Sequence, residues 1–333
     1  GSIDIYHKHT TNLLGFVPQN AFTGYASVYG NAGTINNKGV EITLNSVNIR
    51  NDNFSWSSQL NFAFNKGKVV SLNSEYPIVF ANTVIKGASE QYYQPQTLGL
   101  ITGYQPFSLF AYKYAGLDAV GDPQIHLSNG TITKSPGIAK MEDLVNMGST
   151  NPLVTGGFNN LFQYRQFSLG FNMVFNLGFV LRRDVNEFYT GRIIGNSFIT
   201  GNIHAEFENR WKKSNDELIT NIPAFDPSAD RASRTDLNYY AAADINVVKG
   251  DYIKMRDITF SYQLPNSILK DLKIKNLSLR AQLNNVMLWR ANKYGIDPEF
   301  YNGIGNSSAM YVTGLRSVPV NQKTITLGAH LTF

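Results

Sequence analysis

Apolar and polar residues alternate along several stretches of the chain. In residues 167–179 (FSLGFNMVFNLGF), every second position is Phe, Leu or Met, and the positions between them are mostly Ser, Asn or Gly. An α-helix would spread this pattern around its whole circumference, whereas a β-strand places alternate side chains on opposite faces. The segment is therefore predicted to be a strand of about a dozen residues, longer than the usual five or six.

The same alternation predicts further strands. It is clear in FSWSSQLNFAF (54–64), GVEITL (39–44), DITFSYQL (257–264), LSLRAQL (277–283) and TITLGAHLTF (324–333). Nine strands are predicted in all, at about 3–14, 36–49, 53–70, 107–117, 155–165, 166–179, 248–264, 274–289 and 321–333. If the strands belong to a single-chain bacterial barrel, an even strand number calls for a tenth strand within 119–150. DPQIHLSNGTITK is the one weak candidate there, and the sequence leaves this strand open.

Each predicted strand has one apolar face and one polar face, and two architectures fit this arrangement. The polar face of a soluble β-sandwich usually carries many Lys and Glu residues, whereas here it carries Ser, Thr, Asn, Gln and Gly. A transmembrane β-barrel requires apolar side chains toward lipid and polar side chains toward a wet lumen. The pattern favours the barrel, with Phe54, Trp56, Tyr262 and Phe333 near strand ends expected at the membrane interfaces.

Composition narrows the classes of function. Charged residues make up 16% of the chain, against roughly a quarter in typical soluble domains. The chain has no cysteine, which excludes disulfides, thiolate metal sites and a catalytic thiol. The net charge of +5 is unclustered, so no nucleic-acid partner is expected. No apolar run approaches the ~18 residues of a membrane-spanning helix.

The connections between predicted strands are unequal in length. Residues 48–54 and 264–277 are short, whereas residues 179–247 and 289–321 are long and rich in Asn, Gly, Asp, Pro and Tyr. Membrane barrels have short periplasmic turns and long outer loops. The C-terminus is therefore expected on the periplasmic side and both long stretches outside.

Six segments resemble signatures of one protein family. They are IDIYHKHTTNLL (3–14), NAGTINNKGVEITL (31–44), YKYAGLDAVGDPQ (112–124), GSTNPLVTGGFNNLFQYRQFSL (148–169), GDYIKMRDITFSYQLP (250–265) and YGIDPE (294–299). In this order, and with the closing strand, they resemble the C-terminal part of SusC/RagA-type TonB-dependent outer-membrane transporters. Ile5 departs from the pattern where a second aromatic is common, as do Ala32 and Thr34 where bulkier residues are frequent.

The resemblance implies an all-β fold, namely the C-terminal part (about ten antiparallel strands) of a 22-stranded transmembrane β-barrel. Residues 1–333 would be a single C-terminal barrel part, without the plug domain and the N-terminal strands. The location implied is the Gram-negative outer membrane, as a multi-pass β-barrel. The function implied is TonB-dependent import of oligosaccharides or oligopeptides, with no enzymatic activity and no cofactor.

The resemblance also implies partners. These are the remaining N-terminal part of the barrel with its plug, TonB acting through that plug, and a SusD-like surface lipoprotein. Membrane lipid and lipopolysaccharide would surround the wall, and a dimer of SusCD units is an assembly that the resemblance allows. Two alternatives stay open: a passive porin-like barrel, and a soluble carbohydrate-binding β-sandwich that needs no detergent.

Aromatic side chains in the expected outer loops are the candidate substrate contacts, because Tyr and Trp offer flat faces and a polar tip. The alternative is that they pack the loops together. The candidates are Tyr92, Tyr93, Trp211, Tyr239, Tyr240, Tyr294, Tyr301 and Tyr311. Phe333, the last residue, is expected at the periplasmic girdle and resembles a C-terminal assembly signal.

Ionisable residues suggest structural roles more than chemistry. Lys254 and Arg256 share the apolar phase of Ile258, which predicts cations that reach outer-leaflet phosphates. Asp257, Arg280 and Glu41 are expected to pair on the lumen side. The pair His7 and His9 lacks a third metal ligand and is interpreted as lining the lumen. No nucleophile elbow or EF-hand spacing is present, and Asp226, Asp230 and Asp236 are interpreted as ordinary loop residues.

Overall fold

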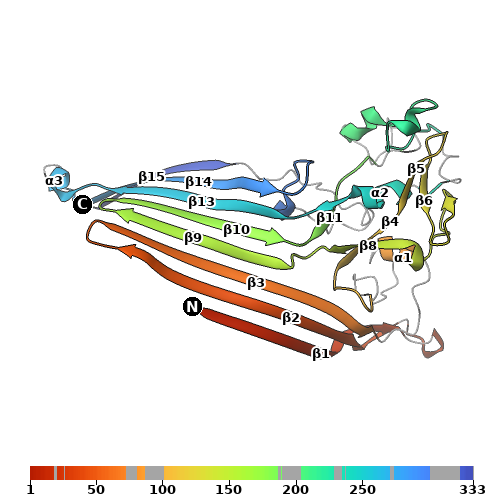
Figure 1. The fold of residues 1–333 in the computed structure, drawn as a ribbon, viewed down its shortest axis with the longest axis horizontal. Helices are drawn as coiled ribbons and strands as arrows, with labels where there is room; N and C mark the ends of the chain where they lie inside the picture. The colour runs from red at the N-terminus through yellow and green to blue at the C-terminus, as the bar shows by residue number, and fades with distance from the viewer. Residues whose placement is uncertain are drawn as a thin grey trace.

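Eight long strands form one antiparallel sheet in the computed structural model (Figure 1). The structure describes residues 1–18, 21–25, 27–72, 81–86, 101–186, 189, 204–228, 235–236, 238–270, 274–300 and 323–332. The strands, in sheet order, are β1 (Ser2–Pro18), β2 (Ser27–Arg50), β3 (Phe54–Leu72), β9 (Val154–Tyr164), β10 (Phe167–Leu177), β13 (Tyr252–Gln263), β14 (Asn276–Arg290) and β15 (Thr324–Thr332). Every neighbouring pair is antiparallel, as the alternation and the short turns predicted.

The connections separate by length onto the two ends of the sheet. Residues 51–53 and 165–166, and the turn with α3 (Asn266–Leu269), lie at the end where the chain terminates (Figure 1). The long connections 73–153 and 178–251 lie at the opposite end, where their described parts fold together. The described part of 179–247 lies at the end opposite the short turns, as predicted, whereas most of the second predicted long stretch, 289–321, lies outside the described residues.

The described parts of the two long connections form a separate folded unit, which we call the cap. Its elements are α1 (Ala81–Lys86), β4 (Ser108–Tyr112), β5 (Tyr114–Leu117), β6 (Pro123–His126), β7 (Ile132–Thr133), β8 (Leu144–Ser149), β11 (Val180–Arg182), α2 (Asn238–Ala241) and β12 (Val247–Lys249). Single 3-10 turns occur at Ala21–Thr23, Met141–Asp143, Ala205–Asn209, Asp216–Leu218, Asp244–Asn246 and Pro298–Phe300. No helix in the described part of the chain is long and apolar enough to cross a membrane.

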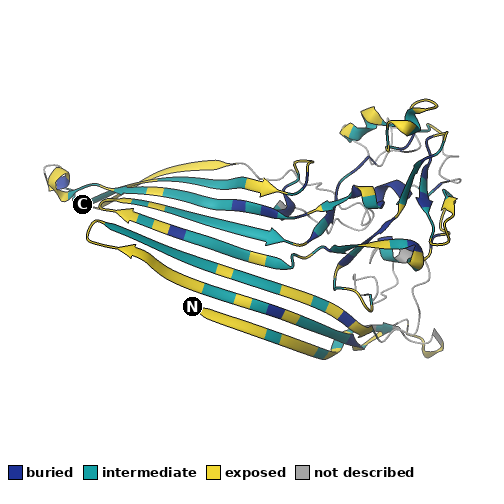
Figure 2. Ribbon diagram, in the orientation of Figure 1, coloured by how far each residue is buried: buried dark blue, intermediate teal, exposed yellow. Residues whose placement is uncertain are grey.

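The cap holds the buried core of the chain. Figure 2 shows buried residues concentrated in the cap, whereas the long sheet is mostly intermediate or exposed. One core cluster joins Ile85, Tyr112, Ile125 and Tyr239, and a second joins Val185 and Tyr240 to their neighbours. The long sheet, by contrast, leaves its apolar face uncovered, with Ile5, Leu44 and Leu327 among its exposed side chains.

One strand prediction is wrong, and one candidate left open by the sequence is not part of the long sheet. Residues 107–117 and 119–150 do not join the long sheet, which has eight strands among the described residues rather than about ten. They form two small sheets of the cap, with the orders β4-β8 and β5-β6-β7. The physical reason is burial: Phe110, Ala111 and Tyr112 are all buried, so adjacent residues on both faces of this strand are covered by the cap. A strand of the long sheet would instead have one uncovered face.

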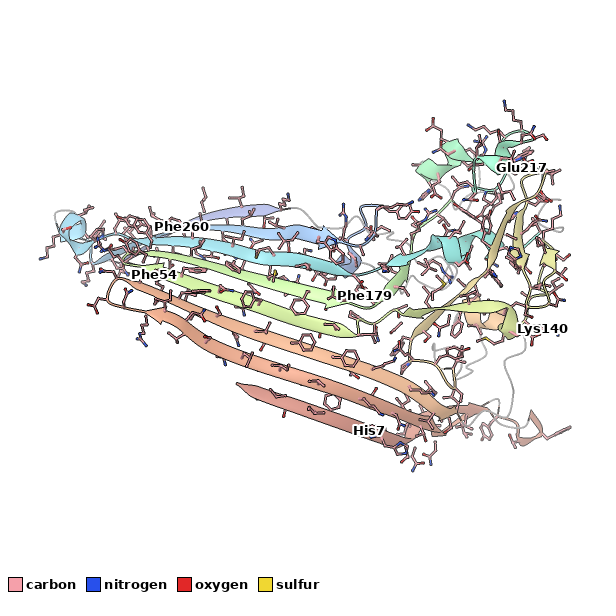
Figure 3. All side chains as sticks on the ribbon, in the orientation of Figure 1. His7, Phe54, Lys140, Phe179, Glu217 and Phe260 are labelled. Atoms are coloured by element: carbon pink, nitrogen blue, oxygen red, sulfur yellow. The ribbon has the colours of Figure 1, made fainter. Side chains whose placement is uncertain are left out.

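The two faces of the long sheet follow the predicted alternation. On the apolar face, Phe54 lies opposite Tyr164, Tyr164 opposite Phe167, and Phe167 opposite Tyr262. This aromatic row crosses four strands at the short-turn end, with the Phe167 and Tyr262 rings stacked at 4.6 Å. In Figure 3, Phe54 lies at that end of the long sheet and Phe179 near the cap. Aromatic rows of this kind are typical of a membrane–water interface.

The apolar face also carries polar residues, among them Asn160, whose amide oxygen has partners, whereas its Nδ2 has none among the described residues. Asn160 is buried among aromatic side chains, and its Oδ1 accepts hydrogen bonds from Trp56 Nε1 at 2.9 Å and Ser58 Oγ at 2.7 Å. Trp56 in turn stacks on Phe162 at 5.5 Å. Because buried polar groups are costly unless bonded, these contacts to its oxygen help an amide to sit on a mainly apolar face.

Candidate functional site

The polar face of the long sheet carries a ladder of neutral hydrogen-bonding side chains. Ser55 Oγ donates to Gln163 Oε1 at 3.0 Å, and Asn159 Nδ2 donates to Gln59 Oε1 at 3.5 Å. On β14, Gln282 Nε2 donates to Asn284 Oδ1 at 2.8 Å. These amides and hydroxyls are held by their neighbours, yet they retain free donor and acceptor positions because each carries several.

Several grooves lie along this polar face, one of them over the ladder itself at Ser57, Gln59 and Asn159. The one at the short-turn end is lined by polar side chains that include Gln163, Ser168, Ser261 and Ser278. The one beside the cap is lined by Asn37, Asn65, Gln105 and Asn151 together with apolar residues. Neutral amides and hydroxyls of this kind suit a ligand rich in hydrogen-bonding groups and with little net charge.

Backbone and side-chain hydrogen bonds join the two long connections into one cap. Arg182 Nη2 donates to the Phe110 carbonyl at 2.6 Å, and the Tyr112 amide donates to the Ala242 carbonyl at 3.0 Å. The Tyr114 amide donates to Asp244 Oδ1 at 3.1 Å. All three bonds join one long connection to the other, and two of them link residues 130 positions apart, so the cap is one packed body.

A charged cluster lies within the cap around Arg183. Arg183 Nη1 contacts Glu206 Oε1, and the Tyr240 hydroxyl donates to Glu206 Oε2 at 3.1 Å. The Arg183 guanidinium also lies 4.6 Å from the centre of the Tyr294 ring. Burial, followed by the nearby Glu206 charge, raises the pKa of Tyr240, so its hydroxyl stays protonated and donates. The cluster connects the second long connection to the segment after β14.

A second ion-paired cluster stabilises the β5–β6–β7 part of the cap. Lys134 Nζ lies 2.5 Å from Asp118 Oδ2 and 3.0 Å from Asp122 Oδ2. Asp118 Oδ1 also accepts the Val120 and Asp122 amides. Burial raises the pKa of Asp118, but the hydrogen bonds from Lys134 and the two amides outweigh it and hold that pKa below its usual range. The cluster fixes a turn and leaves little room for a cation.

Lys254 and Arg256 do not face outward, so the prediction that they reach lipid phosphates is wrong. Asn172 pairs with Asp257 and the next residue, Met173, pairs with Met255, which leaves Arg256 as an extra residue in β13. Such a bulge reverses the alternation, and it turns Lys254 to the polar face beside Tyr252. The Tyr252 hydroxyl confirms this phase, because it lies 2.5 Å from Asn176 Nδ2 on the polar face of β10.

Lys254 instead forms a buried ion cluster with the YGIDPE segment. Its Nζ donates to Asp297 Oδ2 at 3.0 Å and to Glu299 Oε2 at 2.7 Å, and Arg256 contacts Glu299 Oε1. Burial raises the pKa of Glu299, but the bonds from Lys254 and Arg256 outweigh it and lower that pKa. Sequence reasoning missed this cluster, although opposite charges in two family signatures (250–265 and 294–299) were an available signal.

The predicted aromatic contacts fall into three groups. Tyr239 and Tyr240 are buried, and the Tyr239 hydroxyl donates to the Ser135 carbonyl at 3.0 Å, so they pack the cap together. Trp211 is half-buried and donates from Nε1 to Glu217 Oε2 at 2.9 Å, whereas Tyr294 remains 44% exposed. The remaining candidates lie outside the described residues: Tyr92, Tyr93, Tyr301, Tyr311 and the C-terminal Phe333.

Other ionisable residues are placed as follows. His7 and His9 lie on the same face as Ile5, opposite Lys38 and Asn36, and not on the polar face where they were predicted. Within the described ranges, no ion pair involves Asp257, Arg280 or Glu41; Asp257 accepts a bond from Thr259 Oγ1 at 3.3 Å. No group of three His, Asp or Glu side chains suited to a metal occurs in the part of the chain that the structure describes.

Comparison with known sequences identifies related receptors. The chain is 29% identical to TonB-dependent receptor P26 of Formosa agariphila over 346 residues, which cover 99% of this chain and 32% of that receptor. It is also 29% identical to TonB-dependent receptor P3 of the same organism over 353 residues, with 100% and 32% covered. The chain thus spans about a third of the length of the curated relatives it matches. No protein-family model matches it.

Comparison with solved structures identifies the fold. A chain of the RagAB peptide transporter superposes with a TM-score of 0.67 at 20% identity, covering 99% of this chain and 33% of that one. The RagAB peptide importer in its open-open state gives a TM-score of 0.67 at 21% identity, covering 99% and 32%. At this identity the likeness shows the fold alone: the antiparallel sheet with its cap matches about a third of a longer chain.

Proposed function

We propose that this chain, which corresponds to the C-terminal third of a TonB-dependent receptor, forms the closing wall and part of the outer cap of an energy-driven importer. TonB-dependent receptors are outer-membrane β-barrels and not enzymes. In this arrangement the apolar face of the long sheet contacts lipid, the polar face lines the lumen, and the cap faces the outside.

The contrast between the two faces of the long sheet is the observation that carries the proposal. The height of the apolar face agrees with a membrane. From Phe54 to Phe64 the strand β3 extends about 34 Å, or about 26 Å along the membrane normal for a tilt of about 40°. The apolar band of outer-membrane barrels is about 25 Å tall. A passive barrel would share this band, so energy coupling has to be tested separately.

The substrate that the polar face suits is an oligomer with many hydrogen-bonding groups and little net charge. Oligopeptides and oligosaccharides both meet that description, because the ladder of Ser55, Gln59, Asn159 and Gln163 offers amides and hydroxyls without net charge. The likeness to a peptide importer supports the oligopeptide as the first choice. Exposed Tyr294 and half-buried Trp211 are the described aromatic candidates for contact at the mouth.

The partners follow from the family. A plug domain and further strands would precede this chain and complete the barrel, and TonB would act through the plug. A SusD-like surface lipoprotein would sit over the cap, as the name of the RagAB complex suggests for a two-protein assembly. A dimer of such complexes and contact with lipopolysaccharide complete the proposed assembly.

Uptake of labelled substrates by cells that produce the full-length receptor tests this function. Cells are given fluorescent oligopeptides in one arm and fluorescent oligosaccharides of matched mass in the other. We expect accumulation of the oligopeptides, and we expect it to be lost when TonB is deleted or the proton-motive force is collapsed.

Two results would contradict the proposal. Uptake that continues without TonB would indicate a passive barrel. Accumulation of oligosaccharides alone would keep the importer but overturn the choice of peptide. A receptor gene without its plug-encoding region serves as the control for leakage through an open barrel.

A further inference from the structure

A basic cluster lies on the apolar face of β1, β2 and β3, directly beyond the apolar band. Ile5 lies opposite Val40, and Val40 opposite Phe64, which forms the last apolar row. One step further toward the cap, His7 lies opposite Lys38, and Lys38 opposite Lys66. The next row consists of His9, Asn36 and Lys68, with His9 Nδ1 in contact with Asn36 Oδ1.

The two basic rows share the face of the apolar rows because the register is unbroken between them. The pairings Ile5–Val40, His7–Lys38 and His9–Asn36 follow one another at two-residue steps, and so do Val40–Phe64, Lys38–Lys66 and Asn36–Lys68. Side chains two residues apart lie on one face of a strand. The basic cluster therefore faces the same side of the sheet as the apolar band, and in the proposed barrel that side is the outside.

The height of the cluster matches the outer membrane surface. The band from Phe54 to Phe64 has the thickness of a barrel's apolar belt, and Lys66 is one step above it, about 7 Å along the strand. His7 lies toward the cap end of β1, far from the short-turn end marked by Phe54 (Figure 3). Long basic side chains at this level reach the phosphate layer of the adjacent leaflet.

The cationic side chains have no anion among the described residues. Lys38, Lys66 and Lys68 are exposed, and no acidic side chain in the described ranges forms an ion pair with them. Lys38 and Lys66 lie directly opposite each other, and like charges in that position destabilise a strand pair. An external anion would remove this repulsion.

We infer that Lys38, Lys66 and Lys68, flanked by His7 and His9, bind the phosphate groups of an anionic glycolipid, the lipid A part of lipopolysaccharide, at the outer leaflet. The acyl chains lie against the rows of Ile5, Val40 and Phe64 below. This inference rests on the proposed orientation of the wall, with the cap outside. The role of outward-facing cations, which the sequence analysis expected of Lys254 and Arg256, thus falls to residues of β1, β2 and β3.

The test measures lipid A binding to the full-length receptor in detergent by native mass spectrometry. The triple variant Lys38→Gln/Lys66→Gln/Lys68→Gln is expected to bind on the order of 100-fold more weakly than the wild type, from about fivefold for each lysine near an anionic surface. Binding to the wild type is expected to weaken as salt is raised, because the contact is exposed to solvent.

A matched triple variant, Lys8→Gln/Lys212→Gln/Lys213→Gln, removes the same charge elsewhere. Lys8 lies opposite Asn37 on the polar face, and the other two are exposed in the cap. This control is expected to bind lipid A like the wild type. The single variants Lys38→Gln and Lys66→Gln, each about fivefold weaker, keep the test readable should the triple variant assemble poorly.

Three results would overturn the site. They are equal binding by the wild type and the triple variant, equal binding of dephosphorylated lipid A or phosphatidylglycerol, and displacement by inorganic phosphate alone at equal concentration. The last two would assign the cluster to another ligand. Peptide uptake is measured separately, so a failure of the proposed import would not be mistaken for a failure of this site.

Discussion

At the scale of single residues, Lys254 connects the wall to the segment after β14. Its side chain is fully buried and lies between Asp297 and Glu299, while Arg256 holds the second oxygen of Glu299. A buried cation with two bonded carboxylates is stable only as a complete set, because each charge has lost its water. The bulge at Arg256 makes the set possible, since it turns Lys254 inward.

Replacing Lys254 by Met is expected to loosen residues 291–299. Two carboxylates would lose their buried cation, which costs about 3–5 kcal/mol and corresponds to local opening that is roughly 150- to 5,000-fold more frequent. Hydrogen exchange of this segment in the full-length receptor measures the effect. The control is Lys249→Met on β12, an exposed lysine with the same charge change. If the exchange of residues 291–299 were unchanged in Lys254→Met, the ion cluster would not hold this segment. The double variant Lys254→Met/Asp297→Asn, which removes one of the two unpaired carboxylates, is expected to recover part of the protection.

The same cluster predicts an acid-sensitive segment. The pKa of Glu299 is lowered from its ordinary value of 4.5, so the folded state holds fewer protons than the unfolded one. Its stabilising contribution is therefore present above about pH 4.5 and is lost as the pH falls through the lowered pKa. We expect exchange of residues 291–299, corrected for intrinsic rates, to be constant from pH 8 to 5 and to rise below pH 4. Glu299→Gln should remove this pH dependence; a transition near neutral pH would contradict it.

At the scale of elements, the alternation of apolar and polar residues was sufficient to predict the strands of the long sheet. Residues 54–64 and 167–177 alternate except at Ser58 and Val174, and each lies within a strand of the long sheet. The sequence placed all eight wall strands, because a strand between lipid and water has to separate its two faces completely. Alternation could not reveal the bulge at Arg256, since the extra residue is recognised only from the register with β10.

The cap could not be derived from local pattern in the same way. Residues 107–117 are rich in apolar and aromatic residues and were predicted to be one strand, but Lys113 separates them into β4 and β5, which pair with β8 and β6. Tyr239 and Tyr240 were candidates for ligand contact because they fall in a long polar connection. Their burial depends on Tyr112 and Glu206, which lie far away in sequence, so only the tertiary structure places them.

At the scale of the whole molecule, the chain consists of two parts: the long sheet, which we call the wall, and the packed cap. The cap has its own core and its own ion clusters, and it is fixed to the wall through β13 and the segment at 291–299. The wall has almost no buried core among the described residues, and its apolar face is exposed. In the proposed receptor this face contacts lipid, and the polar face of the long sheet lines the lumen.

Spin-label accessibility along β10 tests this division most directly. The chain has no cysteine, so single cysteines can be introduced from 167 to 176 in a full-length, cysteine-free receptor embedded in membranes. We expect nitroxides at Phe167, Leu169, Phe171, Met173 and Phe175 to collide with oxygen dissolved in lipid. We expect those at Ser168, Gly170, Asn172 and Asn176 to collide with a water-soluble nickel chelate. Accessibility to the chelate at both sets of positions, with no period of two, would contradict a membrane wall.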